Sequence, residues 1–401
     1  MDFLELVENV RAEEADAQRL LSGDGLGARS PRVQARAQHM TRLAEATELV
    51  AKAFSGNRWA MLTLQEAMTT SDFPLLFADV LDRQVLQAYR EAPQHWQSVA
   101  KRSEVRDFRT VKRFPRGVGG EAYLTSVAEQ AQYPESSIAD STPYTYSVGK
   151  YGRRMPFAWE TLVNDDLDLL KDVPERFGRA ARATEERFVT QLYVDSSGPH
   201  ASLYTAGHAN IVNTTNGGTV NNIPLSIQGL QDAMLIIGKA VDGNGNPIVI
   251  DMVTLAVPPA LEIVARNIMN ATELRLTRAG GITDGSGANQ ELITTNWMRN
   301  RMQLVVNPWI PIIATSNGNT SWFLFASPAS GPAALEIGFL RGYTEPQVFV
   351  KSPNQQYVGG GAPDVMAGDF DTDSIQYKVR HILGGTTLDY KMTVASNGSG
   401  I

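Results

Sequence analysis

One long amphipathic helix, predicted over residues 164–193, constrains the fold more than any other feature of this sequence. Asn164 can cap the helix, and Asp165 and Asp166 add the acidic charge that favours a helix start. The side chains of one face then recur every three or four residues, at Leu169, Val173, Phe177, Ala181, Thr184, Phe188 and Leu192. A helix of this length extends about 40 Å, which is long for an ordinary domain. We therefore expect a structural spine on which other elements pack.

The first 66 residues form a segment of different composition, rich in Ala, Glu, Arg, Leu and Gln. Two stretches with helical periodicity, 2–21 and 33–54, flank a glycine-rich hinge at 22–27. Both predicted helices have a narrow apolar face. The segment is therefore either a solvated extension or an arm that docks on neighbouring molecules, and the sequence leaves both open. A third helix is predicted from the cap at 70–72 to about Arg90.

Between residues 101 and 150 the pattern changes to short alternating segments separated by Gly and Pro. The segments 106–114 and 143–150 are typical of the two arms of a long hairpin. The stretch between them, 117–142, holds few bulky aliphatic residues, so it is poorly equipped to fold around a core of its own. We expect it to lie on a partner.

The rest of the chain mixes both kinds of element, so the predicted class is α+β, with no internal repeat. Helices are expected at 226–240 and 258–269. Strands are expected at 248–257, 303–306, 322–326, 335–339, 347–351, 374–381 and 387–394.

Composition excludes several functional classes. The chain has 401 residues, of which 43% are hydrophobic and 20% charged, enough for two or three compact modules. It has no apolar run of about 18 residues, so no membrane span is expected, and its acidic N-terminus does not resemble a signal peptide. With no cysteine there is no disulfide framework and no thiolate site. The net charge of −7 argues against a general nucleic-acid coat.

Candidate catalytic groups are few. His200 and His208, with Asp195 as the nearby carboxylate, form the one cluster that could be tested as a catalytic or metal site. The glycine-rich stretches 242–246 and 280–287 lack the lysine and the helix start of a phosphate-binding loop, so turns explain them. We expect no cofactor, no metal and no enzymatic activity.

One charge asymmetry stands out in the hairpin region. A "basic limb" contains only Glu104 and Asp107 beside its cations, which are Lys101, Arg102, Arg106, Arg109, Lys112, Arg113 and Arg116. An "acidic limb" follows, with no basic residue among its members, which are Glu121, Glu129, Glu135 and Asp140. This pattern predicts charge pairing between neighbouring copies of the chain. Nucleic-acid binding through the cations, with Phe108 and Phe114 stacking on bases, is the alternative, and the net acidity favours the protein contact.

The order of several motifs resembles the Mu-like major head subunit family and, more broadly, the tailed-phage capsid proteins of the Hong Kong 97-type fold. The resemblance extends over about residues 70 to 396 and rests on the order of the motifs. These are Phe-Ala-Trp-Glu-Thr-Leu-Val-Asn-Asp-Asp-Leu at 157–167, Leu-Tyr-Thr-Ala-Gly-His-Ala-Asn at 203–210, Leu-Ala-Val-Pro-Pro-Ala-Leu-Glu at 255–262 with Ala265 and Arg266, and Tyr-Lys-Val-Arg at 377–380 with Gly384, Gly385 and Asp389.

The resemblance implies a division into six segments of a Hong Kong 97-type α+β fold. They are a helical N-terminal extension at 1–66, an N-arm with the first helix at 67–104, an extended β-hairpin loop at 105–152, a peripheral domain with the spine helix at 153–225, an axial domain at 226–345, and the C-terminal strands of the peripheral domain at 346–401. Some relatives join neighbours by an isopeptide bond. Lys112 and Lys150 would be the candidates here, but the sequence shows no matching motif, so we expect noncovalent contacts.

The function that the resemblance implies is that of a major capsid protein of a tailed, double-stranded-DNA phage or prophage. Such a subunit assembles as hexamers and pentamers into an icosahedral shell in the host bacterial cytoplasm and remains in the virion capsid. The implied partners are further copies of the chain, a portal, a scaffold or prohead protease, and packaged DNA enclosed without sequence-specific binding; no membrane is involved. An encapsulin-like nanocompartment, which shares the fold and encloses cargo protein, is the alternative.

Overall fold

The computed structural model describes residues 3–22, 31–54, 59–60, 73–113, 126–127, 129, 132, 144–158, 167–214, 220–241, 247–250, 252–278, 290–329, 333–351, 354–355, 358 and 368–400. The chain divides into two compact units. Unit 1 comprises Met1–Pro93, Lys150–Ala183 and Gly342–Ile382, and unit 2 comprises Gln94–Gly149, Thr184–Arg341 and Leu383–Ile401. The predicted spine is helix α6 (Leu167–Tyr193), which contributes residues to both units.

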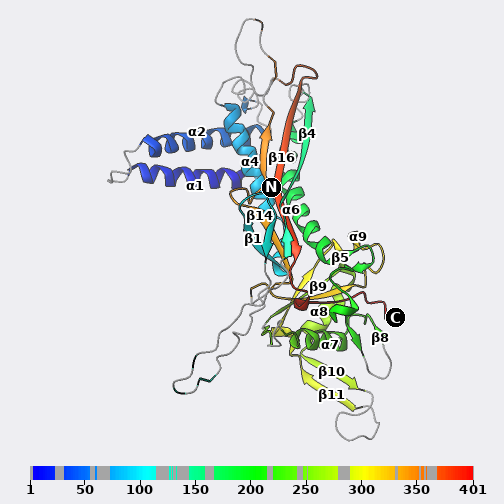
Figure 1. Ribbon diagram of the computed structural model, residues 1–401. Helices are drawn as coiled ribbons and strands as arrows, with labels where there is room; N and C mark the ends of the chain where they lie inside the picture. The colour runs from blue at the N-terminus through cyan, green and yellow to red at the C-terminus, as the bar shows by residue number, and fades with distance from the viewer. Residues whose placement is uncertain are drawn as a thin grey trace. The chain divides into compact units, whose positions relative to one another are not determined.

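Unit 1 begins with a helical hairpin, in which α1 (Phe3–Ser22) and α2 (Pro31–Phe54) lie side by side (Figure 1). Val10, Leu43 and Val50 are fully buried in one cluster with Val85 of helix α4 (Phe73–Glu91). The guanidinium of Arg83 in α4 also lies 2.8 Å from the Glu13 carboxylate of α1. Both helices were predicted, but the sequence left open whether they are solvated or dock on neighbouring molecules. In the structure, one face of the hairpin packs into the core of unit 1 of its own chain.

The same core receives the inner face of a group of strands. Strand β16 (Ser374–Thr387) pairs with β15 (Gln347–Val350) and with β4 (Gly149–Ala158). Tyr377 and Val379 of β16 alternate with outward-facing residues and join Phe157 and Phe177 in the buried cluster. The burial of alternate residues explains why this strand pair has one apolar and one polar face.

Helix α6 crosses α4 at a glycine. A methyl group added at Gly178 would lie 2.5 Å from the carbonyl oxygen of Val85 and 2.9 Å from the Cβ of Ala88. One turn further on, the buried guanidinium of Arg182 donates to the carbonyl oxygen of Tyr89 at 2.9 Å and lies 3.8 Å from the centroid of the Tyr89 ring. The two helices are thus joined by backbone contact and by a charge-assisted hydrogen bond.

Gly178→Ala is expected to lower the free energy of unfolding of unit 1 by about 1–3 kcal/mol, because the added methyl group meets backbone that cannot move away alone. Helix propensity acts in the opposite direction and is worth only about 0.5–1 kcal/mol. Gly238→Ala is the matched control, since a methyl group there meets nothing within 4 Å. Thermal unfolding should show a lower transition temperature for Gly178→Ala and an unchanged or higher one for Gly238→Ala. Equal transition temperatures for the two variants would contradict the close contact of α6 with α4 at Gly178.

Unit 2 contains part of the sheet to which β16 belongs and the whole of a second sheet. In the first, β1 (Ala100–Val105) runs parallel to β14 (Leu335–Leu340), and β14 is antiparallel to the last residues of β16. The second sheet has the order β12 (Met302–Val306), β9 (Val253–Val257), β13 (Trp322–Ala326) and β17 (Thr393–Ser396). All residues of β9 and β13 are buried, as expected for continuous apolar strands covered on both faces.

Aromatic packing forms the centre of this unit. The ring of Tyr193, at the end of α6, meets the rings of Phe323 and Phe325 edge-on at 5.0 Å. The buried amide of Asn307 donates to the Tyr193 hydroxyl at 2.8 Å. Helices α7 (Ile227–Gly238) and α8 (Glu262–Asn270) complete the larger elements.

Unit 2 also contains shorter elements. They are η1 (Trp96–Ser98), β2 (Val111–Arg113), β3 (Tyr144–Tyr146), β5 (Val194–Asp195), β6 (Gly198–Pro199), η2 (Ala206–His208), β7 (Asn213–Thr214), β8 (Val220–Asn221), η3 (Pro259–Leu261), β10 (Glu273–Arg278), β11 (Gln290–Thr295), η4 (Met298–Asn300), α9 (Ile310–Ile313) and η5 (Tyr390–Met392).

The predicted α+β class is confirmed, whereas three predicted strands are wrong in extent. The strand expected over 374–381 continues to Thr387 as β16, because its last residues pair with β14. The strand expected over 248–257 is observed only as β9, because the described residues 248–250 belong to no strand. The strand expected over 387–394 is interrupted by η5, since the Asp389 side chain accepts from the backbone N–H of Lys391 and turns the chain. The six-segment division stays a prediction. In the described part of the chain, no helix is both long and apolar enough to cross a membrane.

Candidate subunit-contact site

The base of the predicted extended loop is a short ladder in unit 2. Strand β2 pairs antiparallel with β3, with Val111 opposite Tyr146 and Arg113 opposite Tyr144. The hairpin predicted from the two alternating segments is therefore confirmed at its base. Most of the residues that it encloses, including Arg116, Glu121, Glu135 and Asp140, lie outside the described residues.

A buried carboxylate joins this ladder to the sheet, and we call its contacts the Glu336 cluster. The Oε1 atom of Glu336, on β14, accepts from the Arg113 guanidinium at 2.7 Å, from the Tyr146 hydroxyl at 2.6 Å and from the Ser103 hydroxyl at 2.7 Å. Glu336 is 4% exposed and Tyr146 is 7% exposed. One carboxylate thus connects β1, β2, β3 and β14.

The charges and hydrogen bonds of the cluster determine which of its groups carry a proton. Arg113 supplies the charge that compensates the buried carboxylate of Glu336. Burial, followed by the hydrogen bond to Glu336, raises the pKa of the Tyr146 hydroxyl, so this hydroxyl stays protonated and donates. Each of the three groups that contact the carboxylate therefore donates a hydrogen bond to it.

Two glycines let the returning arm of the loop lie on the sheet. Gly338 of β14 is directly opposite Gly384 of β16. A methyl group added at Gly338 would lie 2.5 Å from the Tyr146 hydroxyl oxygen. One added at Gly384 would overlap the carbonyl oxygen of Ser147 and approach the Cα of Val148 to 2.8 Å. Side chains at these positions would lift the arm off the sheet and break the Glu336 cluster.

The structure separates the predicted basic limb into two groups. Arg113 points inward to Glu336, so it is engaged within its own chain. The exposed group follows β1 and the turn after it, and consists of Lys101, Arg102, Arg106, Arg109 and Lys112. Within this group, the Arg102 guanidinium lies 5.2 Å from the centroid of the Phe339 ring, and the Arg109 guanidinium lies 3.9 Å from the exposed Asp107 carboxylate. Of the acidic limb, Glu129 is described and is exposed on a turn.

Sequence reasoning missed Ser103, Tyr146 and Glu336, which are remote from one another along the chain. One signal was available: Glu336 is the single charged residue in the fully buried strand Leu335–Leu340. A carboxylate within an apolar strand requires a counter-charge and hydrogen-bond donors, and the structure supplies both.

The histidine cluster considered as a catalytic site is engaged in loop packing. The carboxylate of Asp195 accepts from the backbone N–H groups of Ser197 and Ala201. The Nδ1 atom of His208 lies 2.8 Å from the Leu203 carbonyl oxygen, and its ring stacks on Tyr390 at 4.0 Å. Among the described residues, no group of three or more His, Asp or Glu side chains could hold a metal ion.

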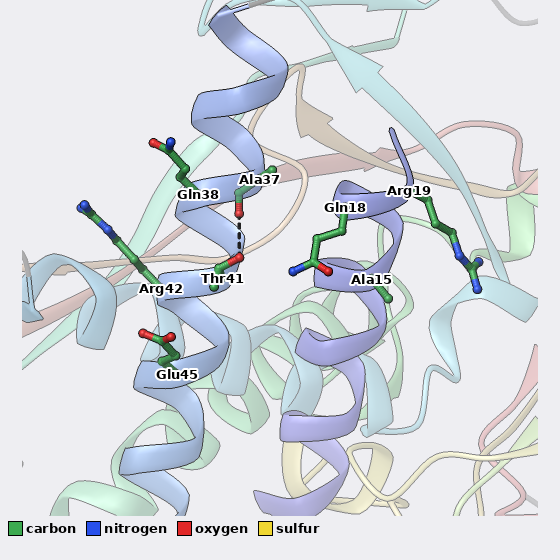
Figure 2. Close-up of a pocket in the computed structure, with 8 residues that line it drawn as sticks. All are labelled: Ala15, Gln18, Arg19, Ala37, Gln38, Thr41, Arg42 and Glu45. Carbon is green, nitrogen blue, oxygen red and sulfur yellow. Dashed lines mark hydrogen bonds between the residues drawn. The ribbon is translucent and has the colours of Figure 1, made fainter. Parts of the chain in front are cut away.

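An open groove of about 800 Å³ lies between α1 and α2 (Figure 2). It is lined by Ala15, Gln18, Arg19, Ala37, Gln38, Thr41, Arg42 and Glu45. The Thr41 hydroxyl is used locally, because it donates to the carbonyl oxygen of Ala37 at 3.2 Å. We assign no ligand to this groove.

Comparison with known proteins gives one match by sequence family. A family model described as phage capsid protein matches residues 142–396, which is more than half of the chain. This range includes β3, the whole of α6, strands β14 and β16, and the whole β12-β9-β13-β17 sheet. No curated protein matches the sequence.

Several solved structures are similar at low identity. For Gordonia phage Cozz, identity is 16%, the match covers 75% of this chain and 84% of that chain, and the TM-score is 0.38. For the procapsid of bacteriophage JBD30, identity is 11%, the match covers 82% of this chain and 75% of that chain, and the TM-score is 0.37. For the SrpI encapsulin complex of Synechococcus elongatus PCC 7942, identity is 12%, the match covers 77% of this chain and 89% of that chain, and the TM-score is 0.39. All three TM-scores are below 0.5.

Proposed function

This chain belongs to the phage capsid protein family and is a major capsid protein, and we propose that it builds the icosahedral head of a tailed, double-stranded-DNA phage or prophage. The observation that carries the proposal is the family match over residues 142–396. The α+β architecture agrees with the Hong Kong 97-type fold, while membership of the Mu-like subfamily stays a prediction. The family description names phage capsids, which favours a phage head over an encapsulin-like compartment.

The assembly mode that we propose is a closed ring of heterologous contacts, giving hexamers and pentamers. A segment with few bulky aliphatic residues, 117–142, gains burial by lying on a folded surface, and we propose that this surface belongs to a neighbouring subunit. Permanent interfaces commonly bury more than about 2,000 Å² in total, and an extended loop adds area without needing its own core. The Glu336 cluster would set the direction in which the loop leaves its subunit.

The contact residues that we propose are the exposed members of the basic limb and the acidic limb. Charges of this kind set register and encounter rate more than affinity, and a single exposed pair contributes little. Because such contacts are screened within about 8 Å at physiological ionic strength, assembly should slow as salt is raised.

The remaining parts of the proposal concern partners and place. We propose a structural role without catalysis, assembly in the host bacterial cytoplasm, and a portal and a scaffold or prohead protease as accessory partners. The net charge of −7 suits a shell that encloses DNA without binding it tightly, because strong contact with phosphates needs an excess of Lys and Arg.

Expression of the chain alone, followed by light scattering and negative-stain electron microscopy, tests the proposal. We expect closed shells or ring-shaped capsomers, alone or after addition of the candidate scaffold. A chain that stays monomeric under both conditions would overturn the proposal.

A further inference from the structure

Helix α6 presents three arginines to solvent along one side. Arg176, Arg179 and Arg187 are exposed, and Ala180 and Ala183 lie between them on the same side. With 3.6 residues per turn, these positions fall within about a third of the helix circumference, and Arg176 and Arg187 are about 17 Å apart along the axis. We call the three cations the arginine stripe. One continuous helix carries them, so helix geometry fixes their spacing.

The stripe is cationic because two carboxylates of the same helix point inward. Glu185 is 0% exposed and Glu186 is 4% exposed. The Glu185 carboxylate accepts from the indole N–H of Trp96 at 3.0 Å, and the Glu186 carboxylate accepts from the backbone N–H of His95 at 2.6 Å. Carboxylates that are buried and satisfied by donors of their own fold do not neutralise the solvent-facing side. This side of α6 therefore differs in sign from the chain as a whole, whose net charge is −7.

One described carboxylate lies beside the stripe. Glu175, one turn before Arg179, forms an ion pair with it. In the part of the chain that the structure describes, no ion pair joins Arg187 to a carboxylate. An exposed pair on a helix surface is weak, so a phosphate oxygen can replace the carboxylate. The stripe therefore has capacity for an anionic partner.

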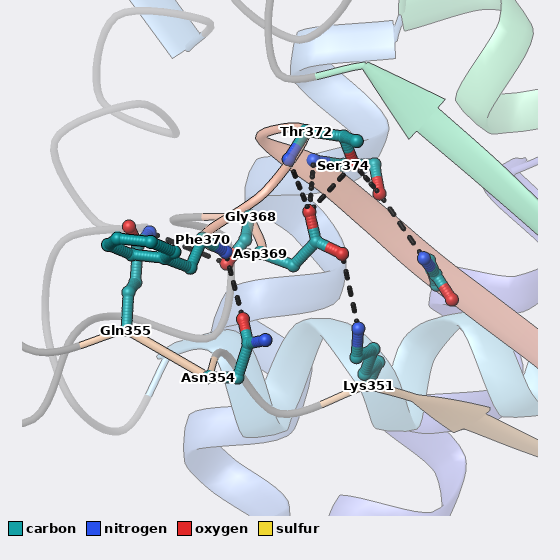
Figure 3. A network of polar contacts seen from close by, with 9 residues as sticks. Lys351, Asn354, Gln355, Gly368, Asp369, Phe370, Thr372 and Ser374 are labelled. Carbon is teal, nitrogen blue, oxygen red and sulfur yellow. Dashed lines mark hydrogen bonds and ion pairs between the residues drawn. The ribbon is translucent and has the colours of Figure 1, made fainter.

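Cations on other elements are held by partners of their own fold. The Lys351 ammonium lies 3.2 Å from the Asp369 carboxylate, which also accepts from the hydroxyl of Thr372 at 2.7 Å (Figure 3). The Thr372 hydroxyl, and then Lys351, hold the pKa of Asp369 well below its usual range, so this carboxylate stays ionised and keeps compensating the lysine. The Arg90 guanidinium lies 3.0 Å from the Glu345 carboxylate. Such pairs have less charge to offer to an outside anion than the stripe has.

The chemistry of the stripe favours nucleic acid over an acidic protein as the partner. Among the described residues of α6, no large apolar side chain is exposed, whereas protein interfaces have an apolar core. Interfaces with nucleic acid are more polar and strongly positive. Guanidinium groups match phosphates in bidentate geometry, and the small side chains of Ala180 and Ala183 leave room for a phosphate backbone to approach the helix.

We propose that the arginine stripe binds the phosphate backbone of the packaged DNA. The inference rests on the proposed function, which supplies enclosed DNA as the polyanion, and charge complementarity carries it. Contacts to phosphates carry no sequence information, so binding is independent of base sequence. Three phosphate contacts per subunit make the affinity fall by about 40-fold between about 50 and about 200 mM salt. Each subunit thus holds DNA weakly and leaves it mobile, in keeping with the net charge of the chain.

Binding of a fluorescent DNA duplex of about 30 base pairs to the unassembled full-length chain tests the inference, measured by anisotropy from about 50 to about 200 mM salt. Arg176→Gln with Arg187→Gln is expected to weaken binding by about tenfold and to reduce the slope of log affinity against log salt by about two. Arg176→Lys with Arg187→Lys should keep most of the slope, because the charge remains. The matched control, Lys239→Gln with Arg341→Gln, removes two exposed cations elsewhere and should change the affinity by less than about twofold.

Each alternative outcome is distinguishable. Unchanged DNA binding by the glutamine variant of the stripe, or an equal loss in the control variant, would overturn the inference. A stripe variant that binds DNA normally but loses scaffold-dependent assembly would identify an acidic protein as the partner and overturn it as well. Circular dichroism of the stripe variant should match the wild type, because the replaced side chains are exposed. Failure of the wild type to form shells, which electron microscopy detects independently of DNA binding, would instead count against the proposed function.

Discussion

Glu336→Ala is expected to release the base of the extended loop and to lower the free energy of unfolding of unit 2 by about 3 kcal/mol. The variant leaves the half-buried Arg113 guanidinium without its carboxylate and removes the acceptor that Ser103 and Tyr146 share. Chemical denaturation measures the loss of stability. Limited proteolysis should show faster cleavage between β2 and β3, and the assembled fraction should fall.

A double-mutant cycle separates the ion pair from other effects of the Glu336 substitution. Glu336→Ala combined with Arg113→Ala should cost less than the sum of the two single changes, because the double variant buries no unpaired charge. Additive costs, or unchanged cleavage of the loop in Glu336→Ala, would show that the cluster does not fix the loop.

Removal of the α1–α2 hairpin, by starting the chain after Phe54, is expected to abolish the folding of unit 1. Full burial of side chains such as Val10, Leu43 and Val50 is worth about 1.5–3 kcal/mol each, and whole domains are stable by only about 5–15 kcal/mol. The deletion also exposes Val85 of α4. Thermal unfolding and hydrogen exchange of α4 measure the effect.

The control for the deletion removes a surface contact of the hairpin and keeps its core. The Arg11 guanidinium pairs with the partly exposed Glu48 carboxylate, so Arg11→Ala should cost less than about 1 kcal/mol. A shortened chain that melts at the same temperature as the full chain would show that the hairpin is an independent arm. Subunits recovered from assembled particles are expected to retain residues 3–54.

The elements predicted best from the sequence are those whose signals lie within one segment. The helix predicted over 164–193 is observed as α6 over Leu167–Tyr193, because its apolar period is a local signal. The predicted cap and acidic start at 164–166 lie outside the described residues. The apolar strand predicted over 322–326 coincides with β13. The base of the hairpin was also predictable, since both of its arms alternate in the sequence.

The parts that could not be predicted depend on contacts between distant segments. The parallel pairing of β1 with β14 joins Ser103 to Gly338, and no local pattern encodes that register. The Glu336 cluster needs this register before Arg113 and Tyr146 can reach the carboxylate. Gly384 stood out in the sequence only as part of a motif, and its physical role, making room for the Ser147 carbonyl, appears only when the two segments meet.

Electron cryomicroscopy of particles assembled from the wild-type chain is the most direct test of the central claim, that this protein is a shell subunit whose extended loop docks on its neighbours. We expect a closed shell of hexamers and pentamers, with residues 114–143 of each subunit lying on a neighbouring subunit. A shell in which this segment folds back onto its own subunit, or a failure to form any closed particle with or without a scaffold, would contradict it.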